Sequence, residues 1–171
     1  TVSLVTRSRD EEFGTRLDVA EGRVLAKEPQ GASPGTSLTV SRLFSNFPAR
    51  RKFLRSTATE TSRVQTLVTR YALAYPEVRF RLDVEDRTAF SSAGSGDLRE
   101  AISSVFGIEI AQAMLELSEP SSAAEEPRPR VWGMISPPEL NRANRSYTSL
   151  FVNRRWVQSR MMGYAVEQAY H

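Results

Sequence analysis

The chain has 171 residues and a mass of 19.2 kDa, which is enough for one domain or two small ones with a buried core. It contains no cysteine and its one histidine is the terminal His171, which argues against disulfide scaffolds, cysteine nucleophiles, cysteine-liganded zinc sites and histidine-based catalytic triads. Lys and Arg number 23 against 20 Asp and Glu, and arginine supplies nearly all of these cations. Because the planar guanidinium suits phosphate groups, this bias favours a nucleic-acid or nucleotide partner.

The sequence has no segment typical of a membrane span or a secretory signal. No apolar run approaches the roughly 18 to 20 residues that span a bilayer, and the N-terminus lacks a basic segment followed by an apolar core. We therefore expect an intracellular protein without a membrane partner. The chain begins at Thr1 in strand-like sequence, without an initiator Met, which indicates a segment of a longer protein.

The first part of the chain is predicted to be rich in β-strand, because short apolar runs are separated by charged or glycine-containing turns. The expected strands cover residues 2–7, 13–20, 23–27 and 36–43, with a hairpin turn at Glu21-Gly22 and a Pro/Gly-rich loop over 29–35. A helix is predicted to begin at Pro48, whose fixed φ suits a first helical turn, with Asn46 as its cap.

The second part is predicted to alternate helices and hairpins. An apolar stripe at helical spacing predicts a helix over 60–74 that ends before Pro76; the stripe consists of Val64, Leu67, Val68 and Tyr71. Strict alternation over 78–85 predicts a half-buried antiparallel strand that pairs with 87–91. The carboxylates Asp83, Glu85 and Asp86 alternate there with Arg79 and Arg81, which favours a solvated or ion-paired surface over a metal site.

Asp97 and Glu100 have the spacing of a capping box, which predicts a helix that ends at Gly107. A second helix is predicted from the register of Ile110, Ala113, Met114 and Leu117. A loop over 119–130, strands over 131–135 and 147–157, and a closing helix over 159–170 complete the pattern. In the closing helix, the residues expected to face inward are Met162, Ala165, Val166 and Ala169. We expect Trp132 and Trp156 in the core or in an interface. This order of elements predicts an α+β chain of two parts, with a boundary near residues 55–62.

Residues 35–54 form the most specific string of the sequence, GTSLTVSRLFSNFPARRKFL. It resembles the fourth ATPase motif of the MutL family of DNA mismatch repair proteins, members of the GHKL ATPase superfamily, in which a Gly-Thr pair precedes Leu-Phe-x-Asn-x-Pro-Ala-Arg-x-Lys-Phe-Leu. Residues 151–157, FVNRRWV, resemble the family's Val-Asn-x-Arg strand, and Gly133 and Ser136-Pro137 precede it as in the family. Two long matches in the family's order make coincidence improbable.

The resemblance implies a division of the chain near the boundary already expected. Residues 1–55 correspond to the C-terminal strands of the GHKL ATPase domain, an α/β sandwich. Residues 56–171 correspond to a transducer domain, incomplete at its C-terminal end, with the left-handed βαβ crossover that the family shares with a ribosomal protein. Such a crossover is rare, and nothing in the residues themselves predicts it.

The function implied is to couple ATP binding and dimerisation to DNA binding, and to signal between mismatch recognition and strand incision. The intact protein would use ATP and Mg, would bind DNA without regard to sequence and in a salt-sensitive manner, and would contact a mismatch-recognition protein and a second copy of itself. The alternative is a stand-alone RNA- or ribosome-binding module of the same crossover fold.

Several motifs of the family do not occur in these residues: the general-base Glu, the Mg-binding Asn, Asp-x-Gly-x-Gly, the Gly-Phe-Arg-Gly-Glu-Ala lid and the His-Pro-x-Lys loop. Phosphoanhydride hydrolysis requires a positioned base and charges that hold the phosphates. We therefore assign no catalytic or metal-binding residue, leave open whether the chain is an enzyme, and expect the isolated chain neither to bind nor to hydrolyse ATP.

The candidate site residues fall into three groups. Gly35 and Thr36 match the family's nucleotide-site wall, although they would also suit the start of any strand after a loop. The candidate DNA-binding residues are Arg142, Arg145, Arg154, Arg155 and Arg160. Arg160 matches a helix-start arginine implicated in DNA binding, Arg155 is alternatively a packing residue, and any one of these arginines could instead be a solvated side chain.

The third group is expected at the joint between the two parts, and consists of Asn46, Pro48, Arg50, Lys52, Phe53 and Leu54. Phe53 and Leu54 are the apolar residues that we expect to wedge the two parts together. The basic residues of this helix start could alternatively respond to a bound phosphate.

Overall fold

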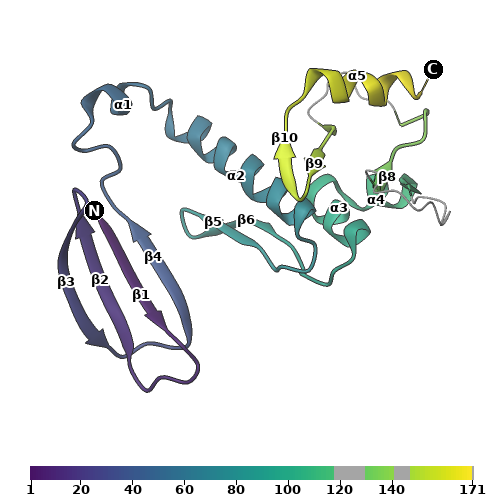
Figure 1. Ribbon diagram of the computed structural model, residues 1–171. Coiled ribbons are helices and arrows are strands. Elements are labelled where there is room, and N and C mark those ends of the chain that lie inside the picture. Colours follow the sequence, from purple (N-terminus) through teal and green to yellow (C-terminus); the bar gives the residue numbers. More distant parts are fainter. Residues whose placement is uncertain (118–129, 141–146, 171) are drawn as a thin grey trace. The chain divides into compact units, whose positions relative to one another are not determined.

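The computed structural model describes residues 1–117, 130–140 and 147–170 (Figure 1). The chain divides into two compact units, Thr1–Arg55 and Ser56–His171, which are described separately. Within the described residues, no helix has the length and apolar character needed to cross a bilayer.

The first unit contains a four-stranded antiparallel sheet in the order β3-β2-β1-β4. Its strands are β1 (Val2–Arg7), β2 (Gly14–Ala20), β3 (Arg23–Gln30) and β4 (Gly35–Val40). Leu4 of β1 lies opposite Leu17 on one side and Leu38 on the other, so the apolar positions of neighbouring strands share one face. Glu21 and Gly22 have φ of 54° and 76°, which confirms the predicted hairpin turn as a type I′ turn.

Two strand boundaries of this sheet differ from those predicted. Pro29 was expected in a loop, but it lies in β3 opposite Thr15. β3 is an edge strand, where the missing N–H of a proline is tolerated. β4 ends at Val40 rather than at residue 43, because Arg42 and Phe44 adopt positive φ of 52° and 61° and turn the chain away from the sheet.

The short helix α1 (Pro48–Lys52) begins at Pro48 as predicted, but Asn46 is not its cap. The N-cap residue is Phe47, which makes no capping hydrogen bond through its side chain. Two successive turns bring Asn46 to the β2–β3 hairpin, where its Nδ2 donates to Oε1 of Glu21 at 2.6 Å. The amide of Asn46 is therefore used to tie the loop to the hairpin instead of the helix start.

The second unit begins with α2 (Thr57–Ala74), whose N-cap Ser56 accepts a hydrogen bond from the backbone N–H of Thr59. β5 (Arg81–Val84) and β6 (Arg87–Ser91) follow as an antiparallel hairpin. Arg81 Nε lies 3.0 Å from the Asp83 carboxylate, which confirms the predicted ion-paired face. α3 (Leu98–Phe106) starts at Asp97, whose carboxylate accepts from the N–H of Arg99, and ends at Gly107, so both predicted helix ends are confirmed.

The helix predicted after Gly107 is shorter than expected. α4 (Ile108–Ala113) ends at Met114, which is extended, and Leu117 lies in a strand instead of a fourth helical turn. That strand, β7 (Leu115–Leu117), pairs with β8 (Gly133–Ile135), a partner distant in sequence. The loop predicted over 119–130 lies outside the described residues except for Arg130.

The last predicted strand is in fact a hairpin of two short strands. β9 (Leu150–Val152) and β10 (Arg155–Val157) are antiparallel and are joined by a turn at Asn153 and Arg154. α5 (Arg160–Gln168) follows, and its cap Ser159 accepts from the N–H of Met162. Ala165 and Ala169 are exposed and Val166 is 37% exposed, so the inward face predicted for this helix is not buried.

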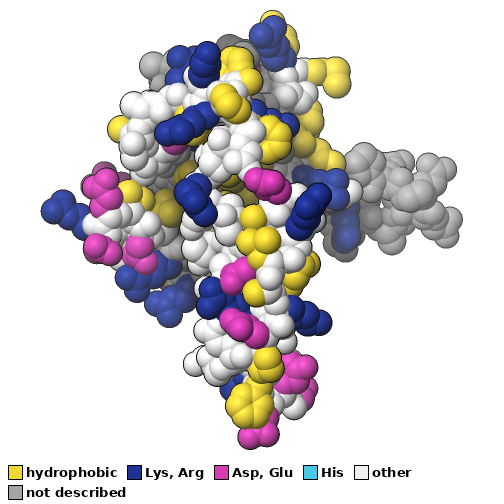
Figure 2. Space-filling model, turned by 90° about the vertical axis from the view of Figure 1, so that its left-hand side faces the viewer, with side chains coloured by type: hydrophobic (Ala, Val, Ile, Leu, Met, Phe, Trp, Pro, Cys, Tyr) yellow, Lys and Arg dark blue, Asp and Glu magenta, His cyan; other side chains and the backbone are white. Residues whose placement is uncertain are grey.

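The core of the second unit is small. It consists of Leu73, Ala101, Ile102 and Ala111, with partly buried side chains packed around it from α3, β8 and β9. α2 enters this core through its C-terminal turn, and the apolar stripe from which the helix was predicted remains largely open: Val64, Leu67 and Tyr71 are each about half exposed. Figure 2 shows exposed hydrophobic side chains lying among Lys, Arg, Asp and Glu on the face in view.

Candidate functional site

The predicted nucleotide-binding pair lies at the start of β4, an edge strand. Gly35 has a φ of 132°, a conformation that side chains with a Cβ rarely adopt, while the space around its Cα is open. Thr36 Oγ1 lies 2.8 Å from Oγ1 of Thr6, whose hydroxyl also lies 3.4 Å from the Gly35 carbonyl. The pair is exposed, and glycine is required at position 35 by backbone conformation rather than by close packing.

A depression of about 600 Å³ in the first unit lies at a different place. It is lined mainly by residues 40–47, together with the β2–β3 turn at Glu21 and Gly22. Neither Gly35 nor Thr36 lines it. The predicted nucleotide-binding pair therefore lies outside this depression.

The residues expected at the joint between the two parts are exposed. Arg50 lies over the ring of Phe47 at 5.4 Å, and Pro48 and Lys52 occupy the two ends of α1. Phe53 is 81% exposed and Leu54 is 41% exposed.

Two of the predicted DNA-binding arginines are exposed on consecutive elements of the second unit. Arg155 begins β10, opposite Val152, and Arg160 is the first residue of α5. The first turn of a helix presents free backbone N–H groups, which favour anions at its N-terminus. Arg142 and Arg145 lie outside the described residues.

Arg154 has different surroundings from its neighbour Arg155. Its Nη1 donates to Oε1 of Glu77, just beyond the C-terminal end of α2, and its guanidinium lies 5.3 Å from the ring centroid of Tyr75. The pKa of Glu77 is lowered by a hydrogen bond from its own backbone and by the hydrogen bond from Arg154. Arg154 is thus engaged with α2.

Arg70 is an important residue that the sequence interpretation missed. It is 8% exposed, donates to Oγ of Ser149, and lies 5.7 Å from the ring of Trp156. Burial lowers its pKa. The signal in the sequence is an arginine followed by an apolar run at the end of α2, but its partners lie far along the chain. Trp156 therefore packs against Arg70, whereas Trp132 is 63% exposed and does not belong to the core.

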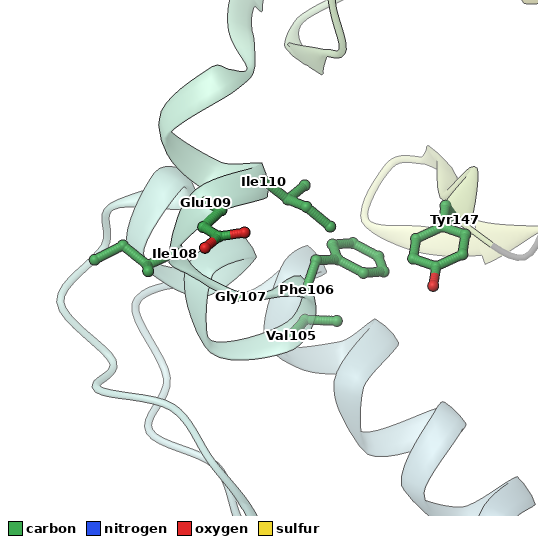
Figure 3. A pocket seen from close by; sticks show the side chains of 7 residues that line it. All are labelled: Val105, Phe106, Gly107, Ile108, Glu109, Ile110 and Tyr147. Atoms are coloured by element: carbon green, nitrogen blue, oxygen red, sulfur yellow. The ribbon is translucent and has the colours of Figure 1, made fainter. Parts of the chain in front are cut away.

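The second unit has an open pocket of about 510 Å³, shown in Figure 3. It is lined by Val105 to Ile110 and by Tyr147, whose ring lies 5.6 Å from that of Phe106. Glu109 contributes the one charged side chain of this lining. None of the predicted site residues lines the pocket, so it supports neither the nucleotide nor the DNA assignment.

Comparison with known proteins covers both units. The model of the family "DNA mismatch repair protein, C-terminal domain" matches residues 102–171. The DNA mismatch repair protein MutL of Desulforamulus reducens is 39% identical over 99% of this chain and 26% of its own length. MutL of Symbiobacterium thermophilum is 39% identical over 98% of this chain and 26% of its own length.

Solved structures give the same result. The Aquifex aeolicus MutL ATPase domain complexed with ADP aligns with a TM-score of 0.76 at 27% identity, over 98% of this chain and 62% of that one. The N-terminal domain of a DNA repair protein, at 21% identity, aligns with a TM-score of 0.80 over 99% of this chain and 54% of its own, and supports the fold alone. The chain spans about a quarter of the length of the curated relatives that it matches. These matches run through both units, and the chain accordingly belongs to the MutL family of DNA mismatch repair proteins.

Proposed function

We propose that this chain couples nucleotide binding and dimerisation to DNA binding within a MutL protein, and takes part in signalling between mismatch recognition and strand incision. The observation that carries the proposal is the alignment of 98% of the chain with a MutL ATPase domain complexed with ADP. That alignment includes the strand that begins at Gly35 and the helix that begins at Arg160.

The first unit supplies part of the nucleotide site in this proposal. Gly35 and Thr36 form one wall, with the Thr6 and Thr36 hydroxyls already paired at the strand start. Carboxylate and amide ligands for Mg, the general base and the lysine that would reach the γ-phosphate come from outside these 171 residues. The chain on its own therefore binds ATP weakly or not at all, whereas the intact protein uses ATP and Mg.

The second unit is the DNA-binding part, and in this proposal it is a transducer domain with the family's left-handed βαβ crossover. Arg155 and Arg160 contact phosphate groups, and Arg142 and Arg145 add positive charge in the sequence just before them. Such contacts are independent of base sequence and weaken with salt, because each one releases counterions from the nucleic acid.

The remaining partners follow from the same assignment. A second copy of the chain and a mismatch-recognition protein are the partners of the intact protein. The alternative of a stand-alone RNA- or ribosome-binding module has less support, because the matches to MutL proteins extend over the first unit as well as the second.

The test uses a full-length MutL protein that carries this chain. Its affinity for duplex DNA is measured by fluorescence anisotropy with and without a non-hydrolysable ATP analogue, at one salt concentration. We expect the analogue to change the affinity, and we expect Thr36→Val to reduce that change while leaving the affinity without nucleotide intact. Equal affinities with and without the analogue in the parent protein would overturn the proposed coupling.

A further inference from the structure

The turn between β9 and β10 holds an arginine in a conformation that favours glycine. Asn153 and Arg154 have φ of 49° and 64°, which defines a type I′ turn. The two other such turns among the described residues have Gly22 and Asp86 at the second position, residues that tolerate positive φ. An arginine there is disfavoured by its Cβ, so interactions of its side chain must offset the cost.

The interactions that offset this cost come from Tyr75 and Glu77, which directly follow α2. Arg154 donates to the Glu77 carboxylate and lies over the ring of Tyr75, which in turn stacks on Tyr71 with centroids 6.2 Å apart. A guanidinium held by both a carboxylate and an aromatic face has a defined position, unlike a solvated arginine. The turn is thereby attached to α2.

A second attachment runs in the opposite direction, from helix to hairpin. Arg70 of α2 reaches Ser149 and the ring of Trp156. Because side chains alternate along a strand, Trp156 faces α2 while Arg155 lies on the other face of the hairpin. Strands of only three residues are marginal by themselves, so these two attachments determine where Arg155 is presented. Figure 1 shows the β9–β10 hairpin beside the C-terminal part of α2.

We propose that Glu77 and Tyr75, acting through Arg154, are positioning residues that hold the β9–β10 hairpin so that Arg155 meets DNA phosphates. This inference rests on the proposed DNA-binding function of the second unit. It assigns Arg154 to the support of the site and Arg155 to the contact with DNA. It also gives two residues that directly follow α2 a role that neither the MutL resemblance nor the charge pattern indicates.

The discriminating variant is Glu77→Gln, because simple electrostatics and the positioning role predict opposite changes in DNA affinity. Removing a negative charge from a DNA-binding surface strengthens binding by simple electrostatics. Loss of the positioning contact weakens it, and for an exposed ion pair backed by an aromatic ring we expect about two- to fivefold weaker binding. Glu109→Gln, on α4, is the control that changes the same charge and leaves both contacts of Arg154 in place.

The measurement is the affinity of the full 171-residue chain for a fluorescent duplex at fixed salt, for the parent and for each variant, below the thermal midpoint of every variant. In the Arg154→Gln background, Glu77→Gln is expected to cause no further weakening, because its partner is already absent. Tyr75→Leu is expected to weaken binding in the same direction as Glu77→Gln. A lower affinity that tracks only a lower thermal midpoint, or equal weakening by Glu77→Gln in both backgrounds, would overturn the positioning role.

The outcomes separate this inference from the function on which it rests. If Arg155→Glu and Arg160→Glu both bind like the parent, the DNA-binding assignment itself is wrong. If those two variants bind more weakly but Glu77→Gln binds as tightly as the parent or more tightly, DNA binding stands and the positioning role is refuted.

Discussion

Arg160 offers the sharpest test of the DNA-binding face, because its contribution can be separated from fold stability. It is exposed at the first position of α5, where an acidic residue interacts favourably with the helix dipole. Arg160→Glu should therefore stabilise the isolated helix start by about 0.3–1 kcal/mol. A variant that keeps or raises its thermal midpoint and yet binds DNA more weakly cannot owe the loss to unfolding.

The magnitude follows from counterion release. Each phosphate contact contributes about 0.9 to the slope of log affinity against log salt concentration for duplex DNA, and about 0.7 for single strands. A fourfold rise in salt, from about 50 to about 200 mM, thus lowers the affinity for a duplex about 3.5-fold for each contact. The Arg160→Glu chain lacks this contact. Over the same rise in salt, its loss of affinity should therefore be smaller than that of the parent by the factor that belongs to one contact.

The assay is fluorescence anisotropy with one duplex at four salt concentrations, with the chain and its variants titrated in parallel. Arg79→Glu makes the same change in charge next to the β5–β6 hairpin and serves as the control. We expect Arg160→Glu to lower both the affinity and the salt slope, and Arg79→Glu to lower the affinity less. Equal slopes for the parent and Arg160→Glu would refute direct phosphate contact by Arg160.

Four other predictions can be checked independently. Phe53→Ala should change the free energy of unfolding by less than about 0.5 kcal/mol, since Phe53 is exposed. In the full-length protein it should nevertheless reduce the effect of an ATP analogue on DNA affinity. An unchanged ratio of the DNA affinities with and without the analogue would exclude Phe53 from the coupling. Asp97→Ala removes the cap of α3 and should cost about 1 kcal/mol in chemical denaturation, and Asp97→Asn should cost less. The pKa of Asp83 is lowered by the Thr88 hydroxyl and then by Arg81. The Asp83 carboxylate therefore contributes stability above its ordinary pKa, and this contribution is lost as the pH falls through the lowered pKa. In Asp83→Asn, the thermal midpoint should accordingly fall less steeply at acidic pH than in the parent. Calorimetry of the isolated chain with MgATP should give no stoichiometric binding, and a stoichiometric isotherm would show that residues within this chain suffice.

Local features of the fold could be predicted from the sequence because their causes lie within a few residues. The cap at Asp97, the helix end at Gly107 and the turn at Glu21-Gly22 depend on side chains that satisfy neighbouring backbone groups or permit positive φ. The resemblance to MutL proteins likewise depends on contiguous strings such as residues 35–54.

Features that depend on distant partners could not be predicted in the same way. Helical periodicity continued through Leu117, but the chain there is extended because β8 pairs with it. The stripe at Val64, Leu67 and Tyr71 is the more hydrophobic face of α2, yet the helix packs through its C-terminal turn, where Ala72 and Ala74 are buried beside Leu73. Small side chains in this turn allow α2 to contact α3 there. The helix therefore packs through this turn instead of through the larger side chains of the stripe.

The candidate DNA site shows the same limit at the level of single residues. Arg154 and Arg155 are adjacent in the sequence and contribute equally to any count of positive charge. The structure separates them, because the turn directs Arg154 to Glu77 and Tyr75 while strand alternation leaves Arg155 exposed on the opposite face from Trp156. A duplex salt slope calculated by counting every arginine of the candidate site would consequently be too steep by one contact, about 0.9. The salt slopes of the parent chain and of the two variants therefore distinguish an arginine that contacts phosphate from one that holds its neighbour in place. Arg155→Glu should lower the slope by a full contact. Arg154→Gln should lower it by at most the part of that contact that depends on the position of the hairpin.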